Sequence, residues 1–270
     1  MTLKNLIPAL GAACMLFCSS CVETSYFQSP LQGNNQGYHA VPVASDSVKS
    51  ATYINASLSF GGSNQNWRDA VYALQAGLHR GHVLDNFRLN YGASLVVGSY
   101  NVKPYYDYYS NKPNAGINVG SKFFGAYGFY GGISAAAPLG RRGEWRYIGL
   151  EGSLFNEFGD YYTFRKNLPD SLASEIDKEK YFGSLGLNTE LVFKFRSQNK
   201  FGIKIAAGSY LRRLNYYDPS GGGNYYYHTH DDLLYFSNTY HFTFNRATAY
   251  FQFNLATHAA HFQVGMNYRL

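Results

Sequence analysis

The sequence has little charge, few cysteines and few tryptophans. Asp, Glu, Lys and Arg together make up 15% of its 270 residues, and its three cysteines all lie within the first 21 positions. So few cysteines exclude a disulfide scaffold, and the lack of a glycine period excludes collagen. Aromatic residues are abundant instead, with 26 Tyr and 20 Phe beside 28 Gly. This content argues against disorder and, because Gly and aromatics crowd out helix formers, against a helical bundle.

The first twenty residues have the pattern of an export signal. Lys4 gives a positive start, and an apolar stretch over 6–17 follows that is too short to span a bilayer. The run CSSC at 18–21 resembles the lipobox of bacterial lipoproteins, with Cys18 where that family prefers Leu. The resemblance implies cleavage before Cys21 and a diacylglycerol and an N-acyl chain such as palmitate on that cysteine. The alternative is an ordinary secretory signal.

Cleavage at that point leaves Cys21 as the only cysteine of the mature chain. We therefore expect no disulfide, no thiol nucleophile, no bound metal and no cofactor. The segment 21–50 is polar and is interrupted by Pro30 and Pro42. It is interpreted as a flexible tether, whose ends would lie about 30 Å apart on average.

From residue 51 onward, apolar and polar side chains alternate with a period of two, which is typical of half-buried strands. Several stretches exceed the length common in soluble sheets and reach the roughly 9–11 residues that cross a bilayer. The pattern predicts an all-β, antiparallel up-and-down barrel over 51–270, with about ten strands at 51–60, 70–80, 87–102, 118–136, 144–158, 182–196, 200–211, 233–244, 247–256 and 261–270.

Alternation alone also fits a soluble sandwich or a lipocalin-like barrel. The membrane reading is favoured because short and long connections alternate along the chain, as in outer-membrane barrels. The last residues, 262–270, resemble the C-terminal β-signal of those barrels, with Leu270 where the class usually has Phe or Trp. The resemblance is to the small, OmpA-like class of outer-membrane proteins and implies an outer-membrane location.

Five charged residues fall on the polar face of the predicted strands, where a dry soluble core would not accept them unpaired. We predict that they form ion pairs that plug the lumen, and a narrow pore is the alternative. These residues are Arg88, Glu151, Glu190, Lys194 and Lys204.

A barrel enzyme acting on envelope lipid or peptide is a second hypothesis. His241 and Ser237 share a strand face, and His258 and His261 lie near the last hairpin, but no nucleophile motif accompanies them. The pair His228 and His230 is too small a ligand set to indicate a metal. We name no catalytic or metal-binding residue.

Tyrosines cluster in the long connections, at 105–109, 161–162, 216–217 and 225–227. They suit an aromatic girdle at the membrane interface or a recognition surface for a protein or glycan partner. No basic block indicates nucleic acid. The primary hypothesis is a lipid-anchored outer-membrane barrel with a structural or loop-mediated binding role; a soluble lipoprotein barrel with a small apolar ligand is a third hypothesis.

Overall fold

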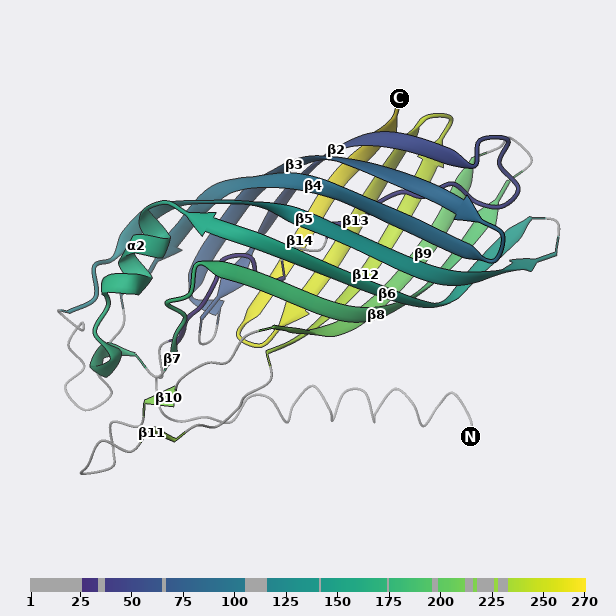
Figure 1. The fold of residues 1–270 in the computed structure, drawn as a ribbon. Coiled ribbons are helices and arrows are strands. Elements are labelled where there is room, and N and C mark those ends of the chain that lie inside the picture. Colours follow the sequence, from purple (N-terminus) through teal and green to yellow (C-terminus); the bar gives the residue numbers. More distant parts are fainter. Residues whose placement is uncertain are drawn as a thin grey trace, which may run out of the picture.

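The computed structural model describes residues 26–33, 37–64, 67–104, 116–140, 142–173, 175–195, 199–211, 216–217, 226–227 and 233–270. In this part of the chain, ten antiparallel strands close into a barrel (Figure 1). The strands are β2 (Ser50–Ser63), β3 (Asp69–Leu84), β4 (Phe87–Val102), β5 (Gly120–Leu139), β6 (Gly143–Phe158), β8 (Tyr181–Lys194), β9 (Lys200–Tyr210), β12 (Leu234–Phe244), β13 (Ala247–Ala256) and β14 (Ala259–Arg269). Each pairs with its neighbour in sequence, and β14 closes onto β2. The predicted fold class is confirmed.

The barrel is apolar outside, and polar side chains face inward along much of its wall, as the last strand illustrates. In β14 the side chains of Phe262, Val264 and Met266 are 40–50% exposed, whereas Gln263 and Asn267 are almost fully buried. Across the seam, Val264 is paired with Leu58 of β2, which is also exposed. Because successive strand residues point to opposite faces, the outward apolar side chains form a continuous surface around the barrel.

The two rims differ in the length of their connections. The turn rim carries 85–86, 140–142, 195–199 and 245–246, and the loop rim carries 64–68, 103–119, 159–180, 211–233 and 257–258. The chain ends at the turn rim, where the Leu270 amide donates to the Thr52 carbonyl (3.0 Å). The expected alternation of short and long connections is thus present, with 257–258 as its short exception.

Smaller elements gather at the loop rim. They are the helix α2 (Asp160–Asn167), the 3-10 turn η3 (Asp170–Leu172), and the two-residue strands β1 (Tyr26–Phe27), β7 (Glu175–Ile176), β10 (Tyr216–Tyr217) and β11 (Tyr226–Tyr227), which form one small sheet (Figure 1). No helix among the described residues is long and apolar enough to cross a membrane.

A β-bulge in β6 changes which side chains face inward. Ala136 of β5 is paired with Arg146 but Ala135 with Ile148, so Tyr147 has no partner of its own. Before the bulge the even-numbered residues of β6 point into the barrel, and after it the odd-numbered ones do. The bulge therefore brings Arg146 and Glu151, which differ in parity, to the same side of the strand.

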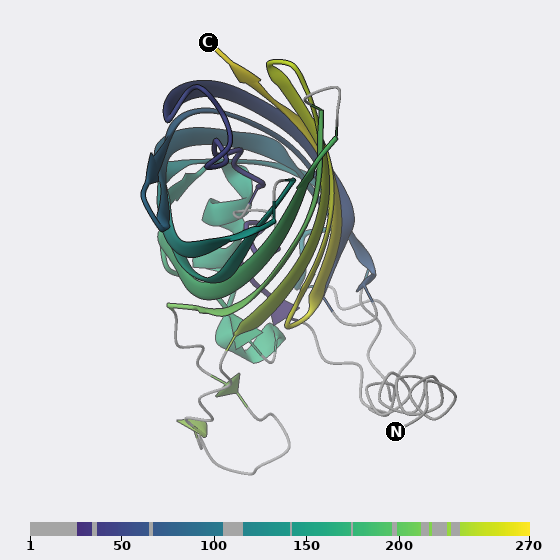
Figure 2. The ribbon, with the colours of Figure 1, turned by 90° about the vertical axis from the view of Figure 1, so that its right-hand side faces the viewer.

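The segment preceding β2 lies inside the barrel. Residues 26–33 and 37–49, here called the lumen segment, run through the ring of strands and appear in purple within it in Figure 2. Phe27, Leu31, Tyr38 and Val43 are all at least 95% buried. The prediction of a flexible tether over 21–50 is wrong for these residues, because most of residues 26–33 and 37–43 are buried in the barrel, and Asp46 is held by Lys200.

Candidate functional site: the barrel lumen

The lumen segment begins at the loop rim. The Tyr26 amide donates to the Asn64 side chain (2.7 Å), and its ring stacks on His258 in the last hairpin, with centroids 3.8 Å apart. Tyr26 also pairs with Glu175 of β7 in a parallel ladder. Further along, the Gly33 amide donates to the Tyr210 hydroxyl (2.7 Å). These contacts fix the start of the segment at the loop rim.

An apolar core fills the loop-rim half of the lumen. Phe27 and Leu31 of the lumen segment are fully buried in it, and α2 contributes Tyr161, whose ring stacks on Tyr100 at 3.8 Å between centroids. Burial raises the pKa of Tyr161, so the phenol stays neutral. The strands add Val71, Ala73, Val96, Val102, Phe124, Ala126, Phe155, Phe182, Tyr210 and Tyr235.

An ion-pair network lies beside this core at the loop rim. Arg165 of α2 is fully buried and pairs with Glu157 of β6 and with Asp177 (3.2 Å) after β7. The Asp177 amide donates to the Phe27 carbonyl (2.9 Å). Helix, loop and lumen segment are thereby joined at the rim.

On the turn-rim side of the middle of the barrel, Tyr38 forms the centre of a polar cluster. Its hydroxyl donates to Glu190 of β8 (2.9 Å) and lies 3.1 Å from Nε2 of His241 in β12. His241 Nε2 is also 2.9 Å from the Glu190 carboxylate. The backbone is held too, because Asn267 donates to the Tyr38 carbonyl (3.1 Å) and His79 Nε2 lies 2.9 Å from the Ala40 carbonyl.

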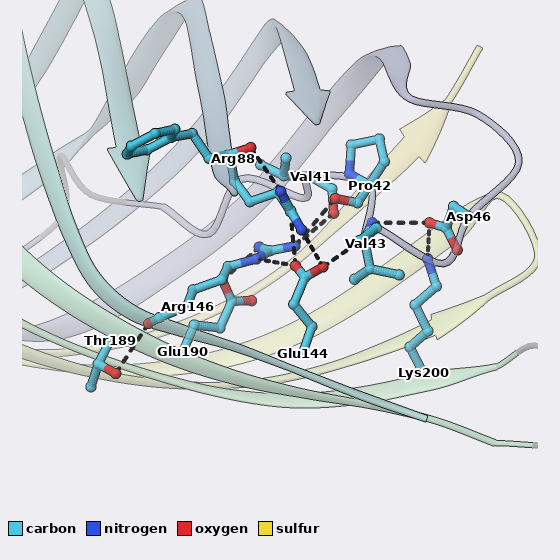
Figure 3. A network of polar contacts seen from close by, with 12 residues as sticks. Val41, Pro42, Val43, Asp46, Arg88, Glu144, Arg146, Thr189, Glu190 and Lys200 are labelled. Atoms are coloured by element: carbon cyan, nitrogen blue, oxygen red, sulfur yellow. Dashed lines mark hydrogen bonds and ion pairs between the residues drawn. The ribbon is translucent and has the colours of Figure 1, made fainter. Parts of the chain in front are cut away.

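Toward the turn rim, Arg146 links the barrel wall to the lumen segment (Figure 3). It pairs with Glu190 (2.7 Å) and Glu144 (3.0 Å), and donates to the carbonyl oxygens of Val41 (3.1 Å) and Pro42 (3.4 Å). Figure 3 shows its guanidinium pointing at this stretch of backbone. A planar group with five donors suits such a junction of two carboxylates and two carbonyls.

Glu144 receives a second arginine and a backbone amide. Arg88 of β4 forms a two-point contact with its carboxylate, at 2.6 and 3.0 Å. The Ala44 amide donates to the same group (2.7 Å). Arg88, Glu144 and Arg146 are each at most 5% exposed, so the network forms inside the barrel.

At the turn rim, the carboxylate of Asp46 holds the end of the lumen segment. Asp46 accepts from Lys200 of β9, lies 3.7 Å from the Lys194 ammonium, and accepts from the Val43 amide (3.1 Å). The Lys49 carbonyl then accepts from the Val83 amide (2.7 Å) near the end of β3, and β2 begins.

Only two of the five predicted lumen residues form an ion pair with each other. Lys204 forms an ion pair with Glu151. Glu190 pairs with Arg146, Arg88 with Glu144, and Lys194 with Asp46. All five predicted charges face the lumen, but three of them have partners that the sequence analysis did not name.

Those partners were missed for two physical reasons. Strict alternation from Leu150 back along β6 places Glu144 and Arg146 on the outward face, and the bulge reverses that assignment. The sequence contains one signal of the bulge. Large apolar residues are odd-numbered at Trp145 and Tyr147 but even-numbered at Ile148 and Leu150. Asp46 was missed because its segment was interpreted as a tether.

The residues of the enzyme hypothesis do not form a catalytic pair. Ser237 and His241 are four strand residues apart, about 13 Å, which exceeds hydrogen-bond reach, and His241 is directed at Glu190 and Tyr38. His258 stacks on Tyr26, and His261 is buried beside Gly33. His228 and His230 lie outside the described residues, among which no group of three metal-ligating side chains occurs.

The space left beside the polar cluster is small. A cavity of about 30 Å³ is lined by Tyr38, His39, Tyr130, Glu151 and other residues, which is room for about two water molecules. Its walls are polar and its size excludes a metabolite. This part of the lumen can hold ordered water and does not offer a substrate pocket.

No protein-family model and no curated protein matches the chain. Solved structures do match, at low identity. An outer membrane channel from Pseudomonas putida F1 is 9% identical with a TM-score of 0.41, covering 86% of this chain and all of that one. The β domain of the Bordetella autotransporter BrkA is 8% identical with a TM-score of 0.43, covering 83% and 100%. The KdgM porin is 9% identical with a TM-score of 0.29, covering 81% and 99%.

Proposed function

We propose that this chain is an outer-membrane β-barrel, anchored additionally by lipid on Cys21, with its lumen closed by its own N-terminal segment and by ion pairs. Its role is structural or is binding through its loops. The observation that carries the proposal is the contrast between an apolar outer face and a lumen that holds buried charges and the chain's own N-terminal segment. A barrel with exposed Leu, Phe and Tyr on every wall suits lipid, since soluble proteins rarely expose large apolar patches.

On the outer face, the strand β8 has the order of side chains that is typical of a membrane barrel. Along β8, Tyr181 stands near the loop rim, Leu185 and Leu187 in the middle, and Phe193 near the turn rim, all of them exposed. Aromatic residues enriched at both interfaces with aliphatic residues between them are typical of membrane barrels. This order supports a spanning orientation with one rim on each side of the bilayer.

The closed lumen favours a structural or binding role over conduction. Apolar packing fills the loop-rim half, and the Arg146 network joins the lumen segment to the wall in the other half. An apolar ligand inside a soluble barrel is not supported, because the chain's own Phe27 and Leu31 occupy the apolar part of the lumen and large apolar side chains are exposed on the outer face. The enzyme alternative is not favoured, because Ser237 lies about 13 Å from His241 along β12, and His241 is directed at Glu190 and Tyr38.

The binding role is assigned to the tyrosine-rich connections at the loop rim. Of the tyrosines concerned, those at 105–109 and Tyr225 lie outside the described residues. Tyrosine gives a large contact area at a low entropic cost, which suits a protein or glycan partner. Outer-membrane lipid is the second partner, and no nucleic acid is expected.

Reconstitution into planar bilayers tests the closed lumen. We expect the purified wild-type protein to insert without a steady ionic conductance. A variant with Arg146→Ala and Lys200→Ala, which loosens the lumen segment at the turn rim, should conduct intermittently. A large steady conductance of the wild type would contradict the proposal.

The loops and the lipid are tested separately. Changing Tyr105, Tyr106, Tyr108 and Tyr109 to Ser should abolish binding to a glycan array or to intact cells without changing heat-modifiable gel migration of the barrel. Cys21→Ser should abolish labelling with radioactive palmitate and leave the barrel in the membrane fraction. Persistent acyl labelling of Cys21→Ser would refute the anchor.

A further inference from the structure

We infer that the N-terminus of the mature chain lies on the loop-rim side of the membrane, so that the lipid on Cys21 anchors the protein in the outer leaflet, at the cell exterior. This inference rests on the proposed outer-membrane location and lipid anchor. It goes beyond them by assigning the leaflet and the face from which the chain enters its own barrel.

The direction of threading follows from the order of contacts along the lumen segment. Tyr26 touches Asn64 and His258, which belong to two loop-rim connections. Tyr38 contacts the wall on the turn-rim side of its middle, and Asp46 contacts Lys200 at the start of β9. Position along the barrel therefore changes steadily with residue number, from the loop rim at 26 to the turn rim at 49.

Chain length then restricts the anchor to one leaflet. Cys21 is five residues before Tyr26, so the two Cα atoms are at most about 18 Å apart. The hydrocarbon core alone is about 30 Å thick. With Tyr26 fixed at the loop rim, the acyl chains on Cys21 reach the leaflet on that side and cannot reach the other.

The identity of that side comes from the connections. Outer-membrane barrels carry short turns toward the periplasm and longer loops toward the exterior. Here the connections 103–119, 159–180 and 211–233 all belong to the rim where Tyr26 lies. The anchor and the long loops are thus on the exterior face.

Epitope insertion in intact cells tests this arrangement. One tag is placed between Glu23 and Thr24, a second at 110 in a long connection, and a third between Arg141 and Arg142 in a short turn. We expect antibody to label the first two on intact cells and the third only after lysis. Membrane fractionation and palmitate labelling are measured on the same strains.

The outcomes separate the inference from the proposed function. A tag after Glu23 that labels only after lysis, beside a tag at 110 that labels intact cells, overturns the exterior N-terminus and leaves the barrel proposal standing. A turn tag that labels intact cells, beside a protected tag at 110, overturns the exterior assignment. Recovery of all three proteins in the soluble fraction overturns the proposed function itself.

A disulfide tests the threading without a tag. A Cβ atom built on Gly33 would lie 3.5 Å from the Cβ of Asn254 in β13, within the range of disulfides. The variant G33C/N254C, made in cells, should migrate differently on denaturing gels with and without reductant, whereas G33C alone should not. Reductant-independent migration of a double variant that still reaches the membrane would overturn the threaded path.

Discussion

The two halves of the lumen are filled in different ways. Near the loop rim, Phe27 and Leu31 sit in an apolar core of the kind found in soluble proteins, whereas near the turn rim Arg146, Glu144 and Glu190 form a charged network. The same N-terminal segment supplies side chains to the first half and mainly backbone groups to the second. The first half depends on shape, and the second depends on each charge having its partner.

This difference decides how the lumen can be opened. Removing a methyl group from a packed core leaves a dry cavity, since apolar cavities stay empty. Removing one partner from the charged half leaves a stranded group that must recruit water. We therefore expect changes at Arg146 to admit ions and changes at Phe27 to lower stability without admitting them.

The largest effect is expected for Arg146→Met, which removes the arginine partner of Glu190 and one of the two arginine partners of Glu144. Loss of one partner from a buried ion pair costs about 3–5 kcal/mol, measured here by urea unfolding in lipid vesicles. Adding Glu190→Gln should recover part of that loss, which a double-mutant cycle quantifies. The control is Arg142→Met at an exposed turn residue, which should leave the unfolding free energy unchanged. Strict additivity of Arg146→Met and Glu190→Gln would mean that the two charges are separately solvated.

The packed half is tested by Phe27→Ala. Truncating a buried Phe costs about 3–5 kcal/mol, and we place this one at the lower end because the lumen segment can shift toward the cavity. Phe27→Leu should recover most of the stability. Ion flux into vesicles should remain at the wild-type level for both variants, and a flux comparable to that of Arg146→Met would remove the distinction between the halves.

A smaller effect is expected for Tyr38→Phe. The change deletes the hydroxyl that donates to Glu190, and hydrogen bonds to charged groups contribute about 1.5–3 kcal/mol. Tyr72, whose ring is 57% exposed on the outer face, gives the matched control Tyr72→Phe. Equal unfolding free energies for the two variants would show that Tyr38 is a filler in the lumen and not a link to its wall.

The smallest effect on stability is expected on the outer face. Spin labels at Leu95 and Val264 should leave the unfolding free energy within about 0.5 kcal/mol of wild type. Their spectra should broaden with oxygen, which partitions into lipid, whereas a label at the buried neighbour Ser94 should not. Accessibility of the Leu95 label to a water-soluble nickel complex would contradict a lipid-facing belt.

Much of the barrel could be predicted from its sequence, because alternation is a local signal. The ten predicted stretches coincide with the ten barrel strands to within a few residues at most ends. The inward orientation of Glu151, Glu190 and Lys204 followed from the same alternation. Their pairing did not, since it depends on which strands face each other across a closed barrel.

The contents of the lumen were much harder to predict. Pro42 and the polar residues before Pro30 suggested a tether, although the run from Tyr38 to Val43 is more apolar than a tether requires. No feature of the sequence near this run predicts that it contacts His241 and Arg146, which are about two hundred and one hundred positions away. Similarly, the bulge at Tyr147 is a departure from the period on which the strand prediction rests.

The threaded segment has a mechanical consequence. The lumen segment passes through the ring of strands and is joined to it at β2, and the lipid that we propose on Cys21 would add bulky acyl chains at its other end. Such a segment cannot be pulled through a filled lumen, so the strands must close around it as β14 meets β2. Once the ring is closed, tension on the anchored end is carried by the contacts of Tyr38 and Arg146 and ends at the first residues of β2.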